Sequence, residues 1–429
     1  MNVRRSLVGL SIALGGVLLT IALGWLHLRY PTARVWLAAC RVGLALLLWT
    51  AAWAGTLVFV RAERDRGAWA GRLRWEARDL ASVVTLSYLL VFFALAAPGF
   101  VRASTFQLVL EQGAVQAIVA VGLTFVLICG EIDLAVGMLA LWSACLCGWL
   151  FEKWGLVSWW LCDNWGGLHS VFLGAWTPKP EVLEPAAGAT IVLVVALPLL
   201  TAILLGLTSG VLTVWSRLPS FIVTLAMMFI AEGMSQFLTK SESLRLPEIL
   251  GRVGNDALEI GPLLHLRGAW AELLALPYNA ILAAGLLLAG HLVLQHTRFG
   301  RYAYMTGGNR EAARLAGVRT GAIVVACLAI CALTAGVGGL VNSGRLSRVD
   351  LSQNKDLLLS AVACVVLGGT SLFGGEGGMG KTLIGVLTFN VLRVGLMKIT
   401  WIDDMARQLL TGVVLMAALV LNGLLGKRR

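Results

Sequence analysis

The chain alternates between long apolar segments and short polar ones. A membrane span needs about 20 apolar residues, and about twelve segments meet that requirement. They lie near residues 6–28, 36–60, 80–98, 106–129, 134–151, 188–215, 219–238, 276–295, 321–343, 357–373, 382–400 and 405–425. The polar gaps between them are too short to hold a soluble catalytic domain. The pattern therefore predicts an all-α, polytopic integral membrane protein.

Composition and charge agree with this prediction. Hydrophobic residues make up 58% of the chain, so its main solvent is lipid. The net charge of +11 is explained by orientation signals and contact with anionic lipid rather than by nucleic acid. Basic residues concentrate in the loop 61–78 and at the end of the chain, 427–429. Both termini are therefore predicted to lie in the cytoplasm.

Two regions follow from the spacing of the spans. Residues 1–80 form an N-terminal extension with two spans and an arginine-rich cytoplasmic loop, and residues 81–425 form the main transmembrane domain. Of the eight cysteines, only Cys162 lies in a predicted loop, so a disulfide framework is not expected. Cys327 and Cys331 share a helix face without a histidine or carboxylate beside them, which indicates packing. No metal or cofactor is predicted.

One polar island, residues 296–320, is enclosed by two spans and must lie at a membrane face. Asn309 is suited to cap a short helix, with Glu311 at its positive end and Gly317 at its termination. Such a helix could dock into a partner's groove, and the alternative is an ordinary charged loop. The residues expected to take part are Gly307, Gly308, Asn309, Glu311, Ala312, Ala313, Leu315 and Gly317.

Two glycine-rich breaks interrupt the apolar pattern, at 130–137 and 368–375. Both follow the pattern G-x-x-[D/S]-L-x-x-G, and paired breaks in two halves of a membrane protein indicate a translocation path. The alternative is two ordinary loops at the membrane face. The residues predicted to line the path are Gln112, Gln116, Gly130, Glu131, Asp133, Gly137, Ser360, Thr370 and Ser371.

The segment 375–382 matches the phosphate-binding pattern G-x-x-x-x-G-K-T. That loop requires a preceding strand and a soluble α/β domain, whereas here predicted spans lie on both sides. We therefore expect Lys381 to act as an orientation charge at the cytoplasmic face.

The longer motifs resemble a known family. Glu311-Ala312-Ala313 with Gly317 is similar to the coupling-helix motif of ABC importer permeases. The strings 131–137, 219–225, 297–317 and 367–372 resemble the monosaccharide ABC permeases of the ribose, xylose and galactose group. Glu131 before Ile132-Asp133-Leu134 is closest to the xylose-type members. The resemblance runs in order from about residue 85 to 425, so residues 81–425 are identified as an ABC permease domain.

The resemblance implies a transport subunit rather than an enzyme, with no catalytic residues of its own. It implies a homodimeric pore in the bacterial cytoplasmic membrane, a separate ATP-binding cassette subunit and an extracytoplasmic sugar-binding protein. The expected substrate is a monosaccharide, a pentose such as D-xylose. The alternatives are another small solute (a nucleoside, an autoinducer or a branched-chain amino acid) or a stand-alone ion-coupled secondary transporter.

The chain departs from the family pattern at several places. Residues 1–80 have no counterpart, and Leu358 and Ser360 replace an acidic pair. Glu232 stands where the family usually has Arg, and Arg393 where it has Asn or Asp. Because a charge within the membrane needs a partner or water, Glu232 and Arg393 are predicted to form a pair of swapped polarity.

Overall fold

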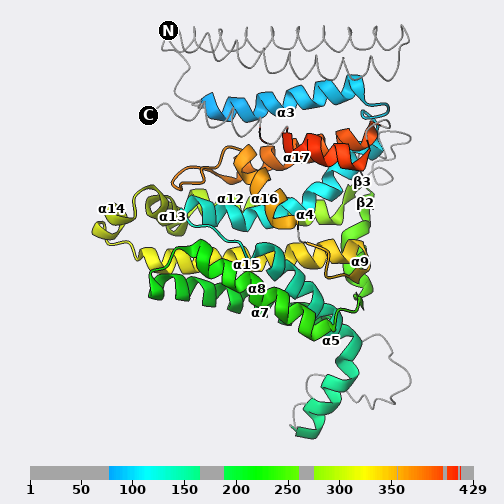
Figure 1. Ribbon diagram of the computed structural model, residues 1–429, viewed down its shortest axis with the longest axis vertical. Helices are drawn as coiled ribbons and strands as arrows, with labels where there is room; N and C mark the ends of the chain where they lie inside the picture. Colours follow the sequence, from blue (N-terminus) through cyan, green and yellow to red (C-terminus); the bar gives the residue numbers. More distant parts are fainter. Residues whose placement is uncertain are drawn as a thin grey trace. The chain divides into compact units, whose positions relative to one another are not determined.

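A computed structural model describes residues 77–164, 188–259, 275–354, 356–399, 403–413 and 416. These residues are mostly helical, as the apolar pattern predicts (Figure 1). The helices are α3 (Ala77–Ala96), α4 (Ala103–Ile128), α5 (Val136–Asn164), α7 (Gly188–Ser216), α8 (Ser220–Thr239), α9 (Glu248–Asn255), α12 (Tyr278–His296), α13 (Arg298–Gly308), α14 (Arg310–Leu315), α15 (Thr320–Arg345), α16 (Leu357–Leu367) and α17 (Met379–Lys398).

Six of the described helices are long and apolar enough to cross a membrane. They are α4, α8, α12, α15, α17 and the segment Val192–Ser216 of α7. Shorter apolar stretches lie in α3, α5 and α16. The predicted spans 6–28 and 36–60, the arginine-rich loop up to residue 76 and the basic C-terminus lie outside the described residues, while Arg78 lies in α3. The membrane class is thus confirmed, while the number of about twelve spans stays a prediction.

The chain divides into two compact units, one of residues 1–106 with 387–429 and one of residues 107–386. In the second unit, α15 packs along α7 and α5, and α5 packs along α8 (Figure 1). Small residues make this contact close: a Cβ on Gly339 of α15 would overlap the backbone of Ala140. Without a hydrophobic force between helices in lipid, such close backbone approach supplies much of the attraction.

The second unit carries different structure at its two ends (Figure 1). One end holds α13 and α14, and we call it the α14 face. The other end, the α9 face, holds α9 and two short antiparallel strand pairs, which the sequence pattern did not predict. They are β1 (Leu244–Arg245) with β4 (Arg348–Val349), and β2 (Ala257–Glu259) with β3 (Ala275–Pro277).

Candidate functional site

The short helix predicted within 296–320 is present as α14. Its N-terminus is capped by Asn309, whose Oδ1 accepts a hydrogen bond from the backbone N–H of Ala312 at 3.0 Å. Glu311 lies in the first turn, beside the positive end of the helix dipole. The predicted cap and charge are therefore confirmed.

Gly317 ends α14 with a left-handed residue, φ +82°. The N–H of Val318 donates to the carbonyl of Ala313, and the N–H of Gly317 donates to that of Arg314, both at 3.0 Å. This is a Schellman motif, in which glycine avoids the steric penalty that a Cβ would meet. The predicted helix end is confirmed, and the reason for glycine is the backbone conformation.

Replacing Gly317 by alanine is expected to weaken the end of α14 by about 1 kcal/mol, because L-residues other than asparagine avoid positive φ. The Cβ itself would meet no atom within 4 Å, so the penalty comes from the backbone alone. Amide hydrogen exchange at residues 317 and 318 should be about fivefold faster in Gly317→Ala. Gly317→Asn is the matched control and should exchange nearly as the natural protein does. Equal protection in both variants would contradict this account.

The faces of α14 differ in exposure. Leu315 is 87% exposed, and Glu311 and Ala312 are also exposed. Ala313 is 1% exposed and packs within the chain itself. A docking partner would therefore meet Leu315 and Ala312, whereas the sequence prediction placed Ala313 on the docking surface as well.

A second helix, α13, precedes α14 and was not predicted. Thr297 caps it by accepting a hydrogen bond from the Gly300 N–H at 3.2 Å. From α13 the Tyr304 hydroxyl donates to the Gly377 carbonyl at 2.9 Å. Burial raises the pKa of Tyr304, which keeps the hydroxyl protonated as a donor. The helix α13 is thereby fixed to the segment just after the second break.

Both breaks begin with the same helix end. Gly130 (φ +79°) closes α4 with hydrogen bonds from Glu131 to Val126 and from Gly130 to Leu127. Gly369 (φ +98°) closes α16 with the equivalent bonds, from Thr370 to Val365 and from Gly369 to Val366. The structural equivalents are therefore Gly130 and Gly369. The sequence match that paired Gly130 with Gly368 is displaced by one residue.

The two breaks meet each other and the end of α13. The Gly375 N–H donates to the Ile128 carbonyl at 2.9 Å. A Cβ on Gly374 would lie 2.8 Å from the Gly130 Cα, and a Cβ on Gly307 would overlap the Ile128 carbonyl oxygen. We call Gly130, Gly307, Gly374 and Gly375 the glycine junction. At Gly307, Gly374 and Gly375 backbones approach more closely than a Cβ would allow, and at Gly130 the positive φ favours glycine.

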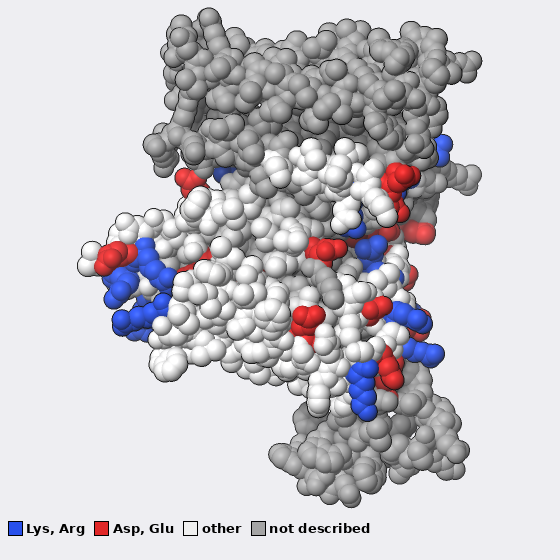
Figure 2. All heavy atoms as spheres, viewed as in Figure 1, with Lys and Arg blue, Asp and Glu red and all other residues white. Residues whose placement is uncertain are grey.

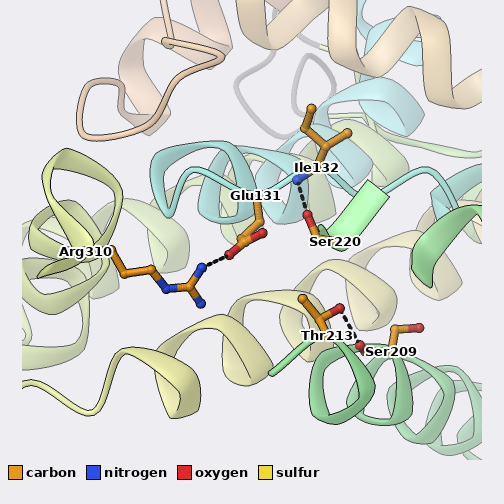
Figure 3. A network of polar contacts seen from close by, with 6 residues as sticks. All are labelled: Glu131, Ile132, Ser209, Thr213, Ser220 and Arg310. Atoms are coloured by element: carbon orange, nitrogen blue, oxygen red, sulfur yellow. Dashed lines mark hydrogen bonds and ion pairs between the residues drawn. The ribbon is translucent and has the colours of Figure 1, made fainter. Parts of the chain in front are cut away.

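The first break is also tied to α8. The N–H of Ile132 donates to Ser220 Oγ at 3.0 Å (Figure 3). The N–H of Leu134 donates to Thr224 Oγ1 at 3.1 Å. The side chain of Asp133 is buried and accepts from the Ala135 N–H at 2.9 Å. These bonds satisfy backbone donors that a broken helix leaves free.

An ion pair joins the first break to α14. Arg310 Nη1 lies 2.8 Å from Glu131 Oε1, and the two residues are 179 positions apart (Figure 3). The Glu131 side chain is 10% exposed, while that of Arg310 is 48% exposed. Arg310 is the first residue of α14, so the helix is anchored where it begins. The sequence analysis predicted Glu131 as a path residue and missed Arg310.

The other predicted path residues do not form one site. Thr370 is buried beside Gly377, with no hydrogen-bond partner for its hydroxyl among the described residues, and Ser371 Oγ accepts from the Phe373 N–H. Ser371 does not cap the next helix, because α17 begins only at Met379. Ser360 Oγ donates to the carbonyl of Leu357, within its own helix.

The remaining predicted path residues lie toward the α9 face. Gln112 lies in the first half of α4 and Gln116 at its middle, both at least three turns from its end at the glycine junction. A Cβ on Gly137 would lie 2.9 Å from the carbonyl oxygen of Asn354. The predicted set is therefore divided between the two ends of the second unit.

Two further expectations concern charge and metal. Glu232 is half-buried on α8, and Arg393 is exposed on α17; the two belong to different units, so their pairing stays a prediction. Cys327 and Cys331 are buried in α15. The described residues contain no group of three or more His, Cys, Asp or Glu that could hold a metal ion.

Exposed arginines gather at the α14 face (Figure 2). Between residues 297 and 319, Glu311 is the one acidic residue. The α9 face carries acidic and basic residues mixed (Figure 2). The exposed arginines of α13, α14 and the residues after them are Arg298, Arg301, Arg310, Arg314 and Arg319.

A bundle of apolar helices, broken twice by glycine and joined to a capped surface helix, is typical of a membrane permease. The sequence comparison agrees with that class. Residues 105–419 match the family described as "Branched-chain amino acid transport system / permease component". The match covers well over half of the chain, and the protein belongs to this family. It is therefore the multi-pass permease component of a transport system.

Individual relatives match over most of their length. The ribose import permease of Escherichia coli K12 is 29% identical over 342 residues, which cover 80% of this chain and 92% of the relative. The ribose import permease of Haemophilus influenzae is 28% identical over 362 residues, 84% of this chain and 96% of the relative. An autoinducer 2 import permease of Photorhabdus luminescens is 25% identical over 351 residues, which cover 81% of this chain and 90% of the relative. No solved structure matches the chain.

Proposed function

We propose that the chain is the membrane-spanning subunit of an ATP-driven ABC importer for a monosaccharide, a pentose such as D-xylose. Its partners are a second permease copy, an ATP-binding subunit, an extracytoplasmic sugar-binding protein and membrane lipid. The observation that carries this proposal is the match of residues 105–419 to the family, together with ribose import permeases that cover 80–84% of the chain. The ATP hydrolysis takes place on the separate subunit.

The α14 face supports contact with an ATP-binding subunit. Arginines outnumber acidic residues there, and basic residues favour the cytoplasmic side of a membrane. The helix α14 places Leu315 in solvent at this face. A surface helix with an exposed apolar side chain is suited to a groove on a partner. We therefore assign α14 as the coupling helix, residues 296–320 as the coupling loop and the α14 face as cytoplasmic.

The glycine junction suggests how force passes from the coupling loop to the path. Gly307 ends α13 against Ile128 and Gly375, so a displacement of the loop acts on both breaks at once. The ATP-bound and ATP-free states must dock α14 differently, since a ligand shifts a conformational equilibrium only through differential affinity. Alternating access would follow from this shift.

Uptake assays distinguish the candidate functions. Vesicles holding the permease, the ATP-binding subunit and the binding protein should accumulate D-xylose or D-ribose with ATP and not without it. Accumulation of a nucleoside, autoinducer 2 or a branched-chain amino acid instead would assign another solute to the same machinery. Ion-driven uptake by this chain alone, insensitive to ATP depletion, would support the secondary transporter.

Leu315→Glu is expected to separate the permease from its ATP-binding subunit. The substitution puts a desolvated charge into the docking groove, and we expect co-purification and ATP-driven uptake to fall at least tenfold. Thermal unfolding should change by less than about 0.5 kcal/mol, since the side chain is exposed. Leu346→Glu, at an exposed leucine just after α15, is the matched control and should leave both measurements unchanged. Undiminished association of Leu315→Glu would argue against α14 as the coupling helix.

A further inference from the structure

Amide side chains collect at one level of the second unit, toward the α9 face. Gly338 of α15 packs against Val119 of α4, and nearer the α14 face Gly122 packs against Thr334. The two helices thus run antiparallel. Toward the α9 face, Asn342 lies about one turn beyond Gly338 on α15, while Gln116 lies about one turn and Gln112 about two turns before Val119 on α4. The residues brought to this level, or linked to it by hydrogen bonds, are Gln112 and Gln116 of α4, Asn342 of α15, and Gln353 and Asn354 of the loop before α16.

We call these five residues the carboxamide layer. Asn342 Nδ2 donates to Asn354 Oδ1 at 2.7 Å, which ties α15 to the loop. Gln353 accepts from the Ser343 hydroxyl at 3.1 Å and donates to the Arg348 carbonyl at 3.2 Å. The amides of α15 and of the loop before α16 are therefore held in place by hydrogen bonds. Asparagines at 342 and 354 and glutamine at 353 were not among the predicted path residues.

Two buried atoms of the layer have no hydrogen-bond partner in the described part of the chain. They are Asn354 Nδ2, a donor, and Gln112 Oε1, an acceptor. Asn354 is 7% exposed, and its backbone takes a left-handed conformation, φ +67°, which asparagine tolerates better than most residues. Leaving such a group unpaired costs about 1–3 kcal/mol, so buried polar atoms normally meet water or a ligand.

The chemistry of the two free atoms indicates the ligand. A hydroxyl group donates and accepts, so it can pair with either atom. An ionised ligand would instead require a compensating charge, which an amide does not provide. We infer that the carboxamide layer is a binding subsite for an uncharged, polyhydroxylated solute on its way through the permease. The inference rests on the proposed function and names where in the chain the sugar hydroxyls are bound.

The layer differs from the path predicted at the breaks. Glu131 is engaged with Arg310, and Asp133 with the backbone of its own turn. Those residues hold the coupling loop and the broken helix together. Within the carboxamide layer, Gln112 Oε1 and Asn354 Nδ2 are the buried atoms without a hydrogen-bond partner in the described part of the chain, so they are available to a solute.

The test uses Asn354→Gly and Gln112→Leu in the complete transporter. Glycine removes the amide, including the acceptor of the bond from Asn342, but it suits the left-handed backbone, so the loop should keep its backbone conformation. We expect each variant to lower kcat/KM for the transported sugar about tenfold, which is the effect of losing one net hydrogen bond to the solute. Gln236→Leu, at an exposed glutamine of α8, is the control for the loss of an amide and should have no effect.

A second measurement separates binding from structure. Uptake of the sugar is compared with uptake of its monodeoxy analogues, for D-xylose and D-ribose. If Asn354 and Gln112 contact hydroxyls, each variant should lose the preference for the parent sugar over at least one analogue. An unchanged preference over all analogues, or unchanged kcat/KM, would overturn the inference.

The proposed function has its own separate readout. Uptake by the natural protein tests whether the system transports sugar, and it does not depend on any variant. If the natural protein takes up the sugar and both variants take it up equally well, the binding role of the carboxamide layer is rejected and the proposed function stands. Uptake of L-leucine and of neither sugar rejects the sugar proposal and the layer with it.

Discussion

Replacing Gly307 by alanine is expected to abolish ATP-driven uptake and to destabilise the protein by about 3 kcal/mol. The added Cβ would overlap the Ile128 carbonyl oxygen and lie 2.8 Å from the Gly375 nitrogen. These two atoms form the hydrogen bond that joins the breaks. Because the obstacle is backbone on both sides, neither neighbour can turn aside as a side chain would. Thermal unfolding in detergent and uptake in vesicles measure the two effects.

Gly308→Ala is the matched control for this variant. The two glycines are adjacent at the end of α13, yet a Cβ on Gly308 would come no closer than 4.0 Å to the Gly375 Cα. We expect its stability to stay within about 0.5 kcal/mol of the natural protein and its uptake to be normal. Equal losses in the two variants would show that the junction has no special role, as would normal behaviour of Gly307→Ala.

Removing the charge of Arg310 is expected to lower uptake about tenfold. In Arg310→Gln the carboxylate of Glu131, only 10% exposed, loses its charged partner. A fully buried pair broken this way costs about 3–5 kcal/mol, while an exposed pair is worth about 0.2–1 kcal/mol. Since Arg310 is half exposed, we expect about 1–2 kcal/mol, measured as thermal stability and as the rate of ATP-driven uptake.

A double-mutant cycle tests whether this loss belongs to the pair. Glu131→Gln removes the other charge, and the double variant should be no worse than either single variant. Arg310→Lys should retain part of the activity, because lysine keeps the charge but lacks the planar fork of arginine. Arg301→Gln, at an exposed arginine on α13, is the control and should behave normally. Additive losses in the double variant would mean that Glu131 and Arg310 act separately.

The coupling helix could be predicted from the sequence because its determinants are local. Asn309 accepts from the N–H three residues ahead of it. At the other end, the N–H of Gly317 bonds three residues back and the N–H of Val318 bonds five residues back. The apolar spans were also predictable, since length and composition alone decide whether a segment can cross lipid. The helix α13 was missed because its residues are polar and its contacts lie elsewhere in the chain.

The sequence pattern located the glycines of the two breaks, but it did not show why glycine is needed at those positions. The pattern indicated that two helices end there, and both do, with the same left-handed glycine. It did not indicate that the breaks touch, because the bond between Gly375 and Ile128 joins positions far apart in the chain. The match of Gly130 to Gly368 shows the limit of a pattern with four matched positions. Gly368 and Gly369 are adjacent in the sequence, but Gly369 is the left-handed residue that ends α16.

The sequence by itself determined that this protein is a helical membrane permease with a capped surface helix at one face. The apolar length of a span and the hydrogen bonds of a helix cap depend on residues that are close together in the chain, so the sequence is enough to predict them. Only the tertiary structure decided that Arg310 pairs with Glu131, that three segments meet at glycines, and that amides from α4, α15 and the following loop share one level. Those relations depend on which helix surfaces pack together, and packing joins residues that no local pattern connects.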